Sequence, residues 1–153
     1  MKTRTPLAAA ALLALLCSIF CVAQDQGYWR ADSTNAKVIT GDIAISNTKL
    51  TINFTSFSLA PIRTLSTAEV AAAFDADVNA GGNGLLYRLN VPAAKRFLRH
   101  NTLCGTDDTQ WMATYVSGRT LQVAFFSGDN PPVLTVDALA NSTDVCGVFT
   151  YAR

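Results

Sequence analysis

The stretch between Trp111 and Phe126 limits the possible folds of this chain more than any other. Trp111–Val116 and Arg119–Phe126 are two apolar-rich runs, and Gly118 between them suits a tight turn. The second run alternates apolar and mixed positions with the period of two that a strand requires. Its apolar face is formed by Leu121, Val123 and Phe125. The pattern predicts an antiparallel hairpin that buries one face.

A second hairpin is predicted between residues 38 and 54. Val38–Ile45 is rich in β-branched residues, Ser46–Lys49 has the composition of a turn, and Leu50–Phe54 alternates strictly. The buried face of the last run is expected to consist of Leu50, Ile52 and Phe54. We therefore expect Phe54 to be a core residue.

Helical signals are few and short. Ser66 followed by Glu69 is a capping box, which predicts a helix of about two turns through Val70–Phe74. Pro92 suits the first turn of a second helix that would end near His100. Further strands are predicted at Tyr28–Arg30, Leu85–Val91, Val133–Val136 and Gly147–Tyr151, with a helical turn near residues 137–139.

Together these elements amount to about seven or eight short strands and two short helices. Consecutive hairpins with one apolar face bury that face by wrapping into a barrel or by packing as two sheets. We therefore predict a mainly β fold, a small antiparallel β-barrel or sandwich.

The first 23 residues have the three-part pattern of a cleavable signal peptide. Lys2 and Arg4 precede the sixteen-residue apolar stretch Leu7–Val22, and small residues precede a cut after Ala23. Sixteen apolar residues are fewer than the roughly 20 that a spanning helix needs. We expect one secreted β-rich domain, residues 24–153, that is periplasmic or secreted after cleavage and has no stable membrane insertion.

The predicted mature chain keeps Cys104 and Cys146, and an oxidising compartment favours one disulfide between them. The alternatives are a reactive thiol or a metal pair, but neither cysteine has a partner at ligand spacing. Cys17 and Cys21 lie in the predicted signal peptide, and each follows a bulky residue, which disfavours lipidation.

The near-neutral net charge of the predicted mature chain argues against nucleic acids and anionic membranes as partners. Without its first 23 residues the chain has ten Lys and Arg residues against eleven Asp and Glu residues, a formal charge of −1. Nucleic acids and anionic membranes both select a basic surface, so neither is expected as a partner.

Four segments carry a resemblance to known proteins. They are Leu86–Leu89, Asn101–Gly105 with the sequence NTLCG, Leu121–Gly128, and Cys146–Tyr151 with the sequence CGVFTY. Together they resemble a group of small exported bacterial proteins without an established function, and this likeness implies export but no catalytic residues. In size, compartment and single bridge the chain is also similar to periplasmic β-barrel inhibitors of lysozyme, in architecture only.

A small basic patch is the first candidate binding site. It consists of Lys95, Arg96, Arg99 and His100, and it could accept an acidic partner or an anionic ligand. The alternative is the solvated face of an amphipathic helix with Phe97 and Leu98 inward. His100, the single histidine, is interpreted as a cation at the end of that helix.

No metal or cofactor is expected. One histidine and a bridged cysteine pair cannot supply the three or four ligands of a zinc site. The run from Asp75 resembles a calcium loop, but Ala80 and Leu86 occupy the positions that need glycine and glutamate. Asp107 and Asp108 are adjacent carboxylates that are expected to lie in an exposed turn. The alternative is that Asp42 or Glu69 partners one of them in space, as a carboxylate hydrolase would need.

Trp111 and Tyr115 are further candidate binding residues, because aromatic side chains line pockets and interface centres as well as cores. The leading hypothesis is a non-enzymatic binding or inhibitor-type domain that recognises another macromolecule. One alternative is a lipocalin-like carrier of a small apolar ligand. Another is a hydrolase that works with carboxylates brought together by the fold.

Overall fold

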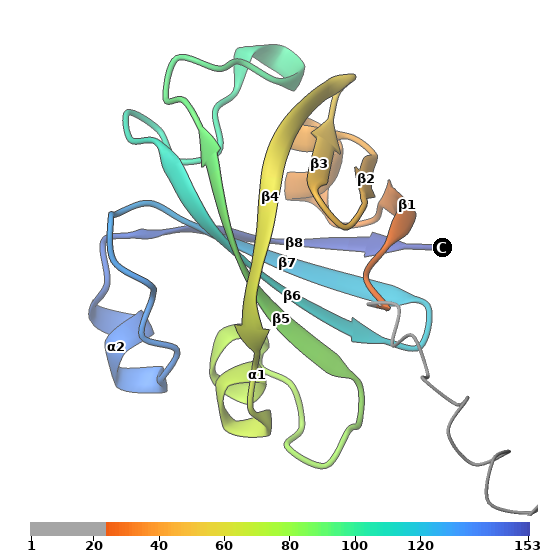
Figure 1. The fold of residues 1–153 in the computed structure, drawn as a ribbon, viewed down its shortest axis with the longest axis vertical. Coiled ribbons are helices and arrows are strands. Elements are labelled where there is room, and N and C mark those ends of the chain that lie inside the picture. Colours follow the sequence, from red (N-terminus) through yellow and green to blue (C-terminus); the bar gives the residue numbers. More distant parts are fainter. Residues whose placement is uncertain (1–23) are drawn as a thin grey trace, which may run out of the picture.

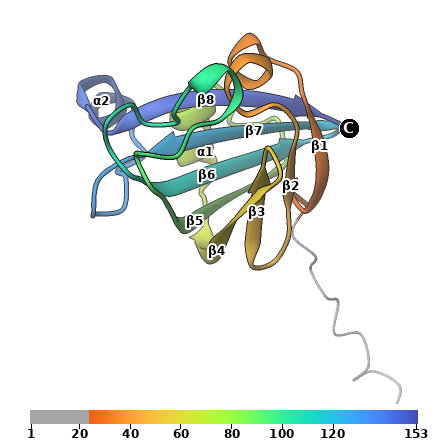
Figure 2. The same ribbon diagram turned by 90° about the horizontal axis from the view of Figure 1, so that it is seen from above.

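The computed structural model describes residues 24–153, so the predicted signal peptide lies outside the described residues. Eight strands form a closed antiparallel barrel in which each strand pairs with the next and β8 pairs with β1 (Figures 1 and 2). The strands are β1 (Gly27–Ala31), β2 (Ile43–Ile45), β3 (Lys49–Ile52), β4 (Thr55–Thr64), β5 (Asn83–Val91), β6 (Thr109–Ser117), β7 (Thr120–Phe126) and β8 (Val145–Ala152). The predicted mainly β fold is confirmed, and of the two predicted arrangements the structure shows the barrel and not the sandwich.

Four short helical elements lie in the connections. They are η1 (Ala36–Thr40), a π-helical turn between β1 and β2; α1 (Thr67–Phe74) between β4 and β5; η2 (Leu98–His100), a 3-10 turn between β5 and β6; and α2 (Val136–Asn141) between β7 and β8. Within residues 24–153, no helix has the length and apolar character to span a lipid bilayer.

The predicted hairpin of residues 111–126 is the most regular part of the barrel. β6 and β7 pair without interruption from Trp111 opposite Phe126 to Ser117 opposite Thr120, and Gly118 has a φ of 58° in the turn. The predicted capping box also forms. The hydroxyl of Ser66 accepts a hydrogen bond from the Glu69 amide, and the Glu69 carboxylate accepts one from the Ser66 amide.

The inside of the barrel is filled by large apolar side chains. Alternate residues of each strand point inward, and the inward set includes fully buried Leu121, Val123 and Phe125, as predicted. Phe125 meets Phe149 of β8 edge to face, with ring centroids 5.4 Å apart. The barrel interior is therefore a packed core.

A second apolar cluster covers the outer face of β5, β6 and β7. Val70 and Phe74 of α1 and Leu134, which precedes α2, pack there against outward-facing strand residues. Those strand residues are Leu86, Trp111, Ala113, Tyr115, Ala124 and Phe126. Because both faces of these strands are covered, β6 is buried almost throughout rather than at alternate positions.

Three predicted elements are wrong. Residues 38–40 belong to η1 rather than to a strand, because Gly41 with a φ of 64° ends that turn before β2 begins. The segment from Pro92 to His100 is not a helix, and only residues 98–100 form a 3-10 turn, in which Arg99 is left-handed. Val133–Val136 is not a strand, since the chain there leads directly into α2.

The connections divide between the two ends of the barrel. The η1 end carries η1, the β3–β4 turn, the β5–β6 connection and the β7–β8 connection. The Asp25 end carries residues 24–26, the β2–β3 and β6–β7 turns, and the end of β8. The β4–β5 connection, which contains α1, also leaves and rejoins the barrel at this end. Figure 1 places the C-terminal end of β8 beside β1.

The Asp25 end is closed by Trp29. Its indole nitrogen donates a hydrogen bond of 2.7 Å to the carbonyl oxygen of Asp25. The guanidinium of Arg153 lies 4.3 Å from the centre of the indole ring and donates to the carbonyl oxygens of Gln24 and Gln26, each at 3.2 Å. The first and last described residues are thereby held together.

The predicted disulfide joins Cys104 to Cys146, with Cα atoms 4.8 Å apart. Cys104 belongs to the β5–β6 connection and Cys146 to β8. The bridge therefore fixes a long connection at the η1 end to the last strand.

Candidate binding surface at the η1 end

Phe54 occupies the tip of the β3–β4 hairpin and is completely exposed. Ile52 pairs with Thr55, so Asn53 and Phe54 alone form the turn, with φ angles of 46° and 64°. Two left-handed residues in a two-residue hairpin loop are the geometry of a type I′ turn, in which the second position favours glycine. The prediction that Phe54 is a core residue is wrong, because the strand ends at Ile52 and the turn directs the ring into solvent.

A bulky residue in this conformation is strained by about 1–2 kcal/mol relative to glycine. Such strain is retained where surrounding structure imposes it, and it concentrates at binding and catalytic sites. Five non-glycine residues in the described chain have positive φ angles, and four of them lie at the η1 end: Asn53, Phe54, Arg99 and His100. Backbone strain is therefore concentrated at this end of the barrel.

The predicted basic patch lies beside the Phe54 turn. The ammonium group of Lys95 donates a hydrogen bond of 2.9 Å to the hydroxyl of Thr55, the residue after Phe54. Arg96, Arg99 and His100 are exposed. Beneath them Phe97 is buried and meets Phe57 of β4 edge to face, with centroids 6.0 Å apart. The structure thus brings the four basic residues to the same rim as the exposed phenylalanine.

The expected helical context of His100 is wrong. No helix precedes it, because Arg99 and His100 have φ angles of 53° and 60° and end the 3-10 turn. The side chain of Asn101 holds this region by donating to the carbonyl oxygens of Leu98 and Val38. His100 is therefore displayed on a loop that is tied to η1.

A hollow of about 430 Å³ opens next to Phe54, where the outer face of β1, β2 and β3 meets η1 and η2. We call it the Asp42 hollow. It is lined by Tyr28, Thr40, Gly41, Asp42, Ile43, Ala44, Thr51, Asn53, Phe54 and Leu98. Its only ionisable groups are the carboxylate of Asp42 and the phenol of Tyr28. The sequence indicated Asp42 only as a possible partner of Asp107 or Asp108, and no pattern pointed to Tyr28.

Hydrogen bonds hold Asp42 in its charged form. The Tyr28 hydroxyl donates to one carboxylate oxygen, and the Ala31 amide donates to the other at 2.9 Å. These two bonds lower the pKa of Asp42, and the nearby charge of Arg30 lowers it further. The same bond to Asp42 raises the pKa of Tyr28. The hollow therefore carries one negative charge at neutral pH.

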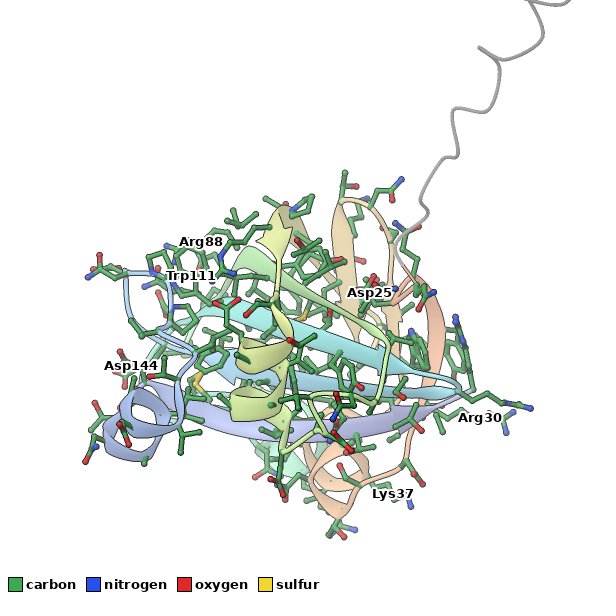
Figure 3. The ribbon with its side chains drawn as sticks, turned by 90° about the horizontal axis from the view of Figure 1, so that it is seen from below. Asp25, Arg30, Lys37, Arg88, Trp111 and Asp144 are labelled. Atoms are coloured by element: carbon green, nitrogen blue, oxygen red, sulfur yellow. A yellow bond between two sulfur atoms is a disulfide. The ribbon has the colours of Figure 1, made fainter. Side chains whose placement is uncertain are left out.

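Trp111 and Tyr115 are not part of this surface. Both are 6% exposed and belong to the cluster on the outer face of β5–β7. Tyr115 stacks on Phe74 and donates a 2.8 Å hydrogen bond to the Gly81 carbonyl oxygen. The guanidinium of Arg88 lies 4.6 Å from the centre of the Trp111 ring, and the two side chains are adjacent in Figure 3.

Four aspartates line a different hollow at the η1 end, of about 450 Å³. They are Asp107, Asp108, Asp129 and Asp144, drawn from the β5–β6 and β7–β8 connections. Asp107 and Asp108 are exposed, as predicted, and Asp108 accepts a hydrogen bond from the Ala93 amide at 2.7 Å. In residues 24–153, no three histidine, cysteine or acidic residues are arranged to hold a metal ion.

One buried acid was not anticipated. Asp25 is 1% exposed, and its Oδ2 accepts hydrogen bonds of 2.8 Å from the hydroxyls of both Tyr87 and Thr114 inside the barrel. Its Oδ1 is buried without a hydrogen-bond partner. Burial, together with the charge of Asp25, raises the pKa of Tyr87. A single aspartate near a predicted cleavage site gives no sequence signal for this placement.

Searches for related proteins return no match. No protein-family model, curated protein or solved structure matches this chain. The resemblance to exported bacterial proteins therefore stays a prediction.

Proposed function

We propose that this protein is an exported, non-enzymatic binding domain that recognises another macromolecule through the rim formed by Phe54 and the basic residues Lys95, Arg96, Arg99 and His100. Export follows from the signal-peptide pattern of residues 1–23. The domain would act in the periplasm or the external medium, with Phe54 as the anchor that enters a pocket on a partner protein.

The observation that carries this proposal is the fully exposed ring of Phe54 on a strained turn. Glycine at this position would relieve the strain, so stability alone does not explain a phenylalanine there. Phenylalanine is among the aromatic residues enriched at protein interfaces, where buried aromatic anchors contribute much of the binding energy. The neighbouring basic residues supply charge that favours an acidic partner surface.

The packed interior gives less support to a lipocalin-like carrier. Such a carrier encloses its ligand inside the barrel. Here that space is occupied by fully buried side chains from several strands, including Met112, Phe125 and Tyr151. The carboxylate hydrolase gains no support from Asp42 or Glu69, because the pKa of each is lowered, whereas a general acid needs a raised pKa.

Capture of partners from periplasmic extract and culture medium, with residues 24–153 as the immobilised bait, tests the proposal. The matched variants are Phe54→Gly and Val78→Ala, because Val78 is also exposed, at 55%, but lies in the connection between α1 and β5. We expect a specific protein to be retained by the wild type and by Val78→Ala but not by Phe54→Gly.

Two results would contradict the proposal. One is a partner that Phe54→Gly retains as well as the wild type does. The other is the retention of no protein, together with stoichiometric binding of a lipophilic dye, which would favour the carrier.

A further inference from the structure

The Asp42 hollow combines a fixed negative charge with apolar walls. Ala44 of β2 and Leu98 of η2 are half-buried in its lining, while the side chain of Ile43 belongs to the barrel core behind it. The exposed ring of Phe54 borders it. Its volume of about 430 Å³ falls within the range of small-molecule sites, roughly 300–1,000 Å³.

The carboxylate of Asp42 has no cationic partner in contact with it. In residues 24–153 the only ion pair closer than 4.0 Å joins Arg63 to Glu69, at the end of β4 that lies away from this hollow. Each oxygen of Asp42 accepts one hydrogen bond, from Tyr28 or from Ala31. Because an ionised carboxylate offers about four acceptor sites, both oxygens keep capacity for a further donor.

Other positively charged groups near the hollow repel a cationic ligand at longer range. Arg30 acts on Asp42 through its charge, but it does not form a contact ion pair. Figure 3 shows Arg30 projecting away from the barrel and Lys37 projecting from η1. Arg99 follows Leu98 directly and is exposed. An incoming cation therefore gains contact with Asp42 against a background of positive charge at longer range.

We propose that the Asp42 hollow binds a primary ammonium or guanidinium group carried on a short apolar chain. The cation would donate to the Asp42 carboxylate, and its chain would lie against Leu98 and the ring of Phe54. Charge-assisted hydrogen bonds to the carboxylate favour such a ligand over a neutral or anionic one, and burial of its chain against the apolar lining adds to the binding free energy.

The chemistry is shared by two sources of ligand. One is the side chain of a lysine or arginine on the partner protein, and in that case the inference rests on the proposed function and adds a specificity element to it. The other is a free small amine. Either source uses the same carboxylate and the same apolar walls.

Titrations followed by amide NMR on residues 24–153 test the site with defined probes. Suitable probes are n-hexylammonium chloride, n-hexanol and sodium hexanoate, which share a six-carbon chain and differ in charge. Hexylammonium is expected to shift the amides of Asp42, Ile43, Phe54 and Leu98 and to bind about tenfold more tightly than hexanol. Hexanoate is expected to bind more weakly than hexanol.

Two variants assign the charge preference to one carboxylate. Asp42→Asn keeps one acceptor oxygen for the Ala31 amide, and its amide nitrogen can donate to the Tyr28 hydroxyl, so both contacts can still form. Its affinity for hexylammonium is expected to fall to that of hexanol. Arg30→Gln removes a competing charge and is expected to strengthen hexylammonium binding. Equal shifts from hexylammonium and hexanoate, unchanged affinity in Asp42→Asn, or shifts that map elsewhere would overturn the proposal.

A blocked lysine, Nα-acetyl-lysine methylamide, distinguishes the two sources. Binding as tight as that of hexylammonium supports a lysine side chain of a partner, whereas binding of hexylammonium alone supports a free amine. These titrations need no partner protein. A failed capture experiment therefore overturns the proposed function without touching this site, and failed titrations leave the Phe54 proposal standing.

Discussion

The hydroxyl of Tyr87 donates a 2.8 Å hydrogen bond to Oδ2 of Asp25, joining residues 62 positions apart inside the barrel. Thr114 of β6 donates to the same oxygen at the same distance. Residues 24–26 are thus held from within by Asp25 and from outside by Arg153, which donates to the carbonyl oxygens of Gln24 and Gln26. The segment that follows the predicted cleavage site is therefore part of the folded domain.

This contact predicts a large effect for a small change at Asp25. Asp25→Ala leaves the hydroxyls of Tyr87 and Thr114 buried without their acceptor, and each such loss costs about 1–3 kcal/mol. We expect the free energy of unfolding to fall by about 2–4 kcal/mol in urea denaturation at pH 7. Thr114→Val removes only one of the two donors, so its free energy of unfolding is expected to fall less than that of Asp25→Ala. Identical urea midpoints for wild type and Asp25→Ala would show that the contact is not stabilising.

The strained turn predicts a variant that gains stability. Phe54→Gly relieves the left-handed strain and is expected to raise the free energy of unfolding by about 1 kcal/mol, seen as a higher Tm. Phe54→Ala is the matched control, because it removes the ring but keeps a Cβ atom, so its Tm is expected to stay near the wild-type value. Destabilisation of Phe54→Gly would mean that the ring supports the fold.

The contrast between Phe54 and Gly118 shows what the sequence could predict. Gly118 correctly predicted the β6–β7 turn, because a tight hairpin turn needs a residue with positive φ and glycine adopts that conformation without strain. Phe54 continued the alternation of Leu50 and Ile52, so nothing in the pattern indicated that the strand ends two residues earlier. The alternation therefore predicted a strand that continues through Asn53 and Phe54. The position of the turn is instead set by the pairing of β3 with β4, which the alternation within one strand does not show.

The basic patch and the aromatic candidates show the same limit. The sequence identified Lys95, Arg96, Arg99 and His100 on a predicted helix, and the structure keeps them at one rim on a loop. Trp111 and Tyr115 alternate with inward residues on a strand whose outer face is also covered, by α1 and by Leu134 before α2, and sequence alternation cannot show that cover. The Asp42 hollow gathers residues from β1, β2, β3 and η2, so no single segment could reveal it.

The capping box predicts a dependence of stability on pH. Arg63 holds Glu69 through two bonds of 2.7 and 2.8 Å, and this contact, together with the Ser66 amide, lowers the pKa of Glu69 from 4.5 to about 2. Because the folded-state pKa lies below that of the unfolded chain, the contribution is complete above about pH 4.5 and is lost as the pH falls towards 2.

Glu69→Gln isolates that contribution. Arg63 is 44% exposed, so solvent screens the pair, and we expect a loss of about 1 kcal/mol at pH 6. The difference between wild type and Glu69→Gln in urea denaturation is expected to shrink between pH 4.5 and pH 2. If the stability difference stayed constant over this range, the negative charge of Glu69 would not contribute, and the loss in Glu69→Gln would come from the capping hydrogen bonds alone.

The bridge between Cys104 and Cys146 predicts a kinetic as well as a thermodynamic effect. It encloses a sequence separation of 42 residues, for which the chain-entropy account gives a stabilisation of about 4 kcal/mol. We expect no free thiol in the exported protein by Ellman assay and a loss of a few kcal/mol in Cys146→Ser. Because the bridge ties the β5–β6 connection to β8, loss of the bridge is also expected to speed hydrogen exchange in residues 101–108 more than in β6 and β7. Uniform acceleration over the whole domain would instead show that the bridge acts only on global unfolding.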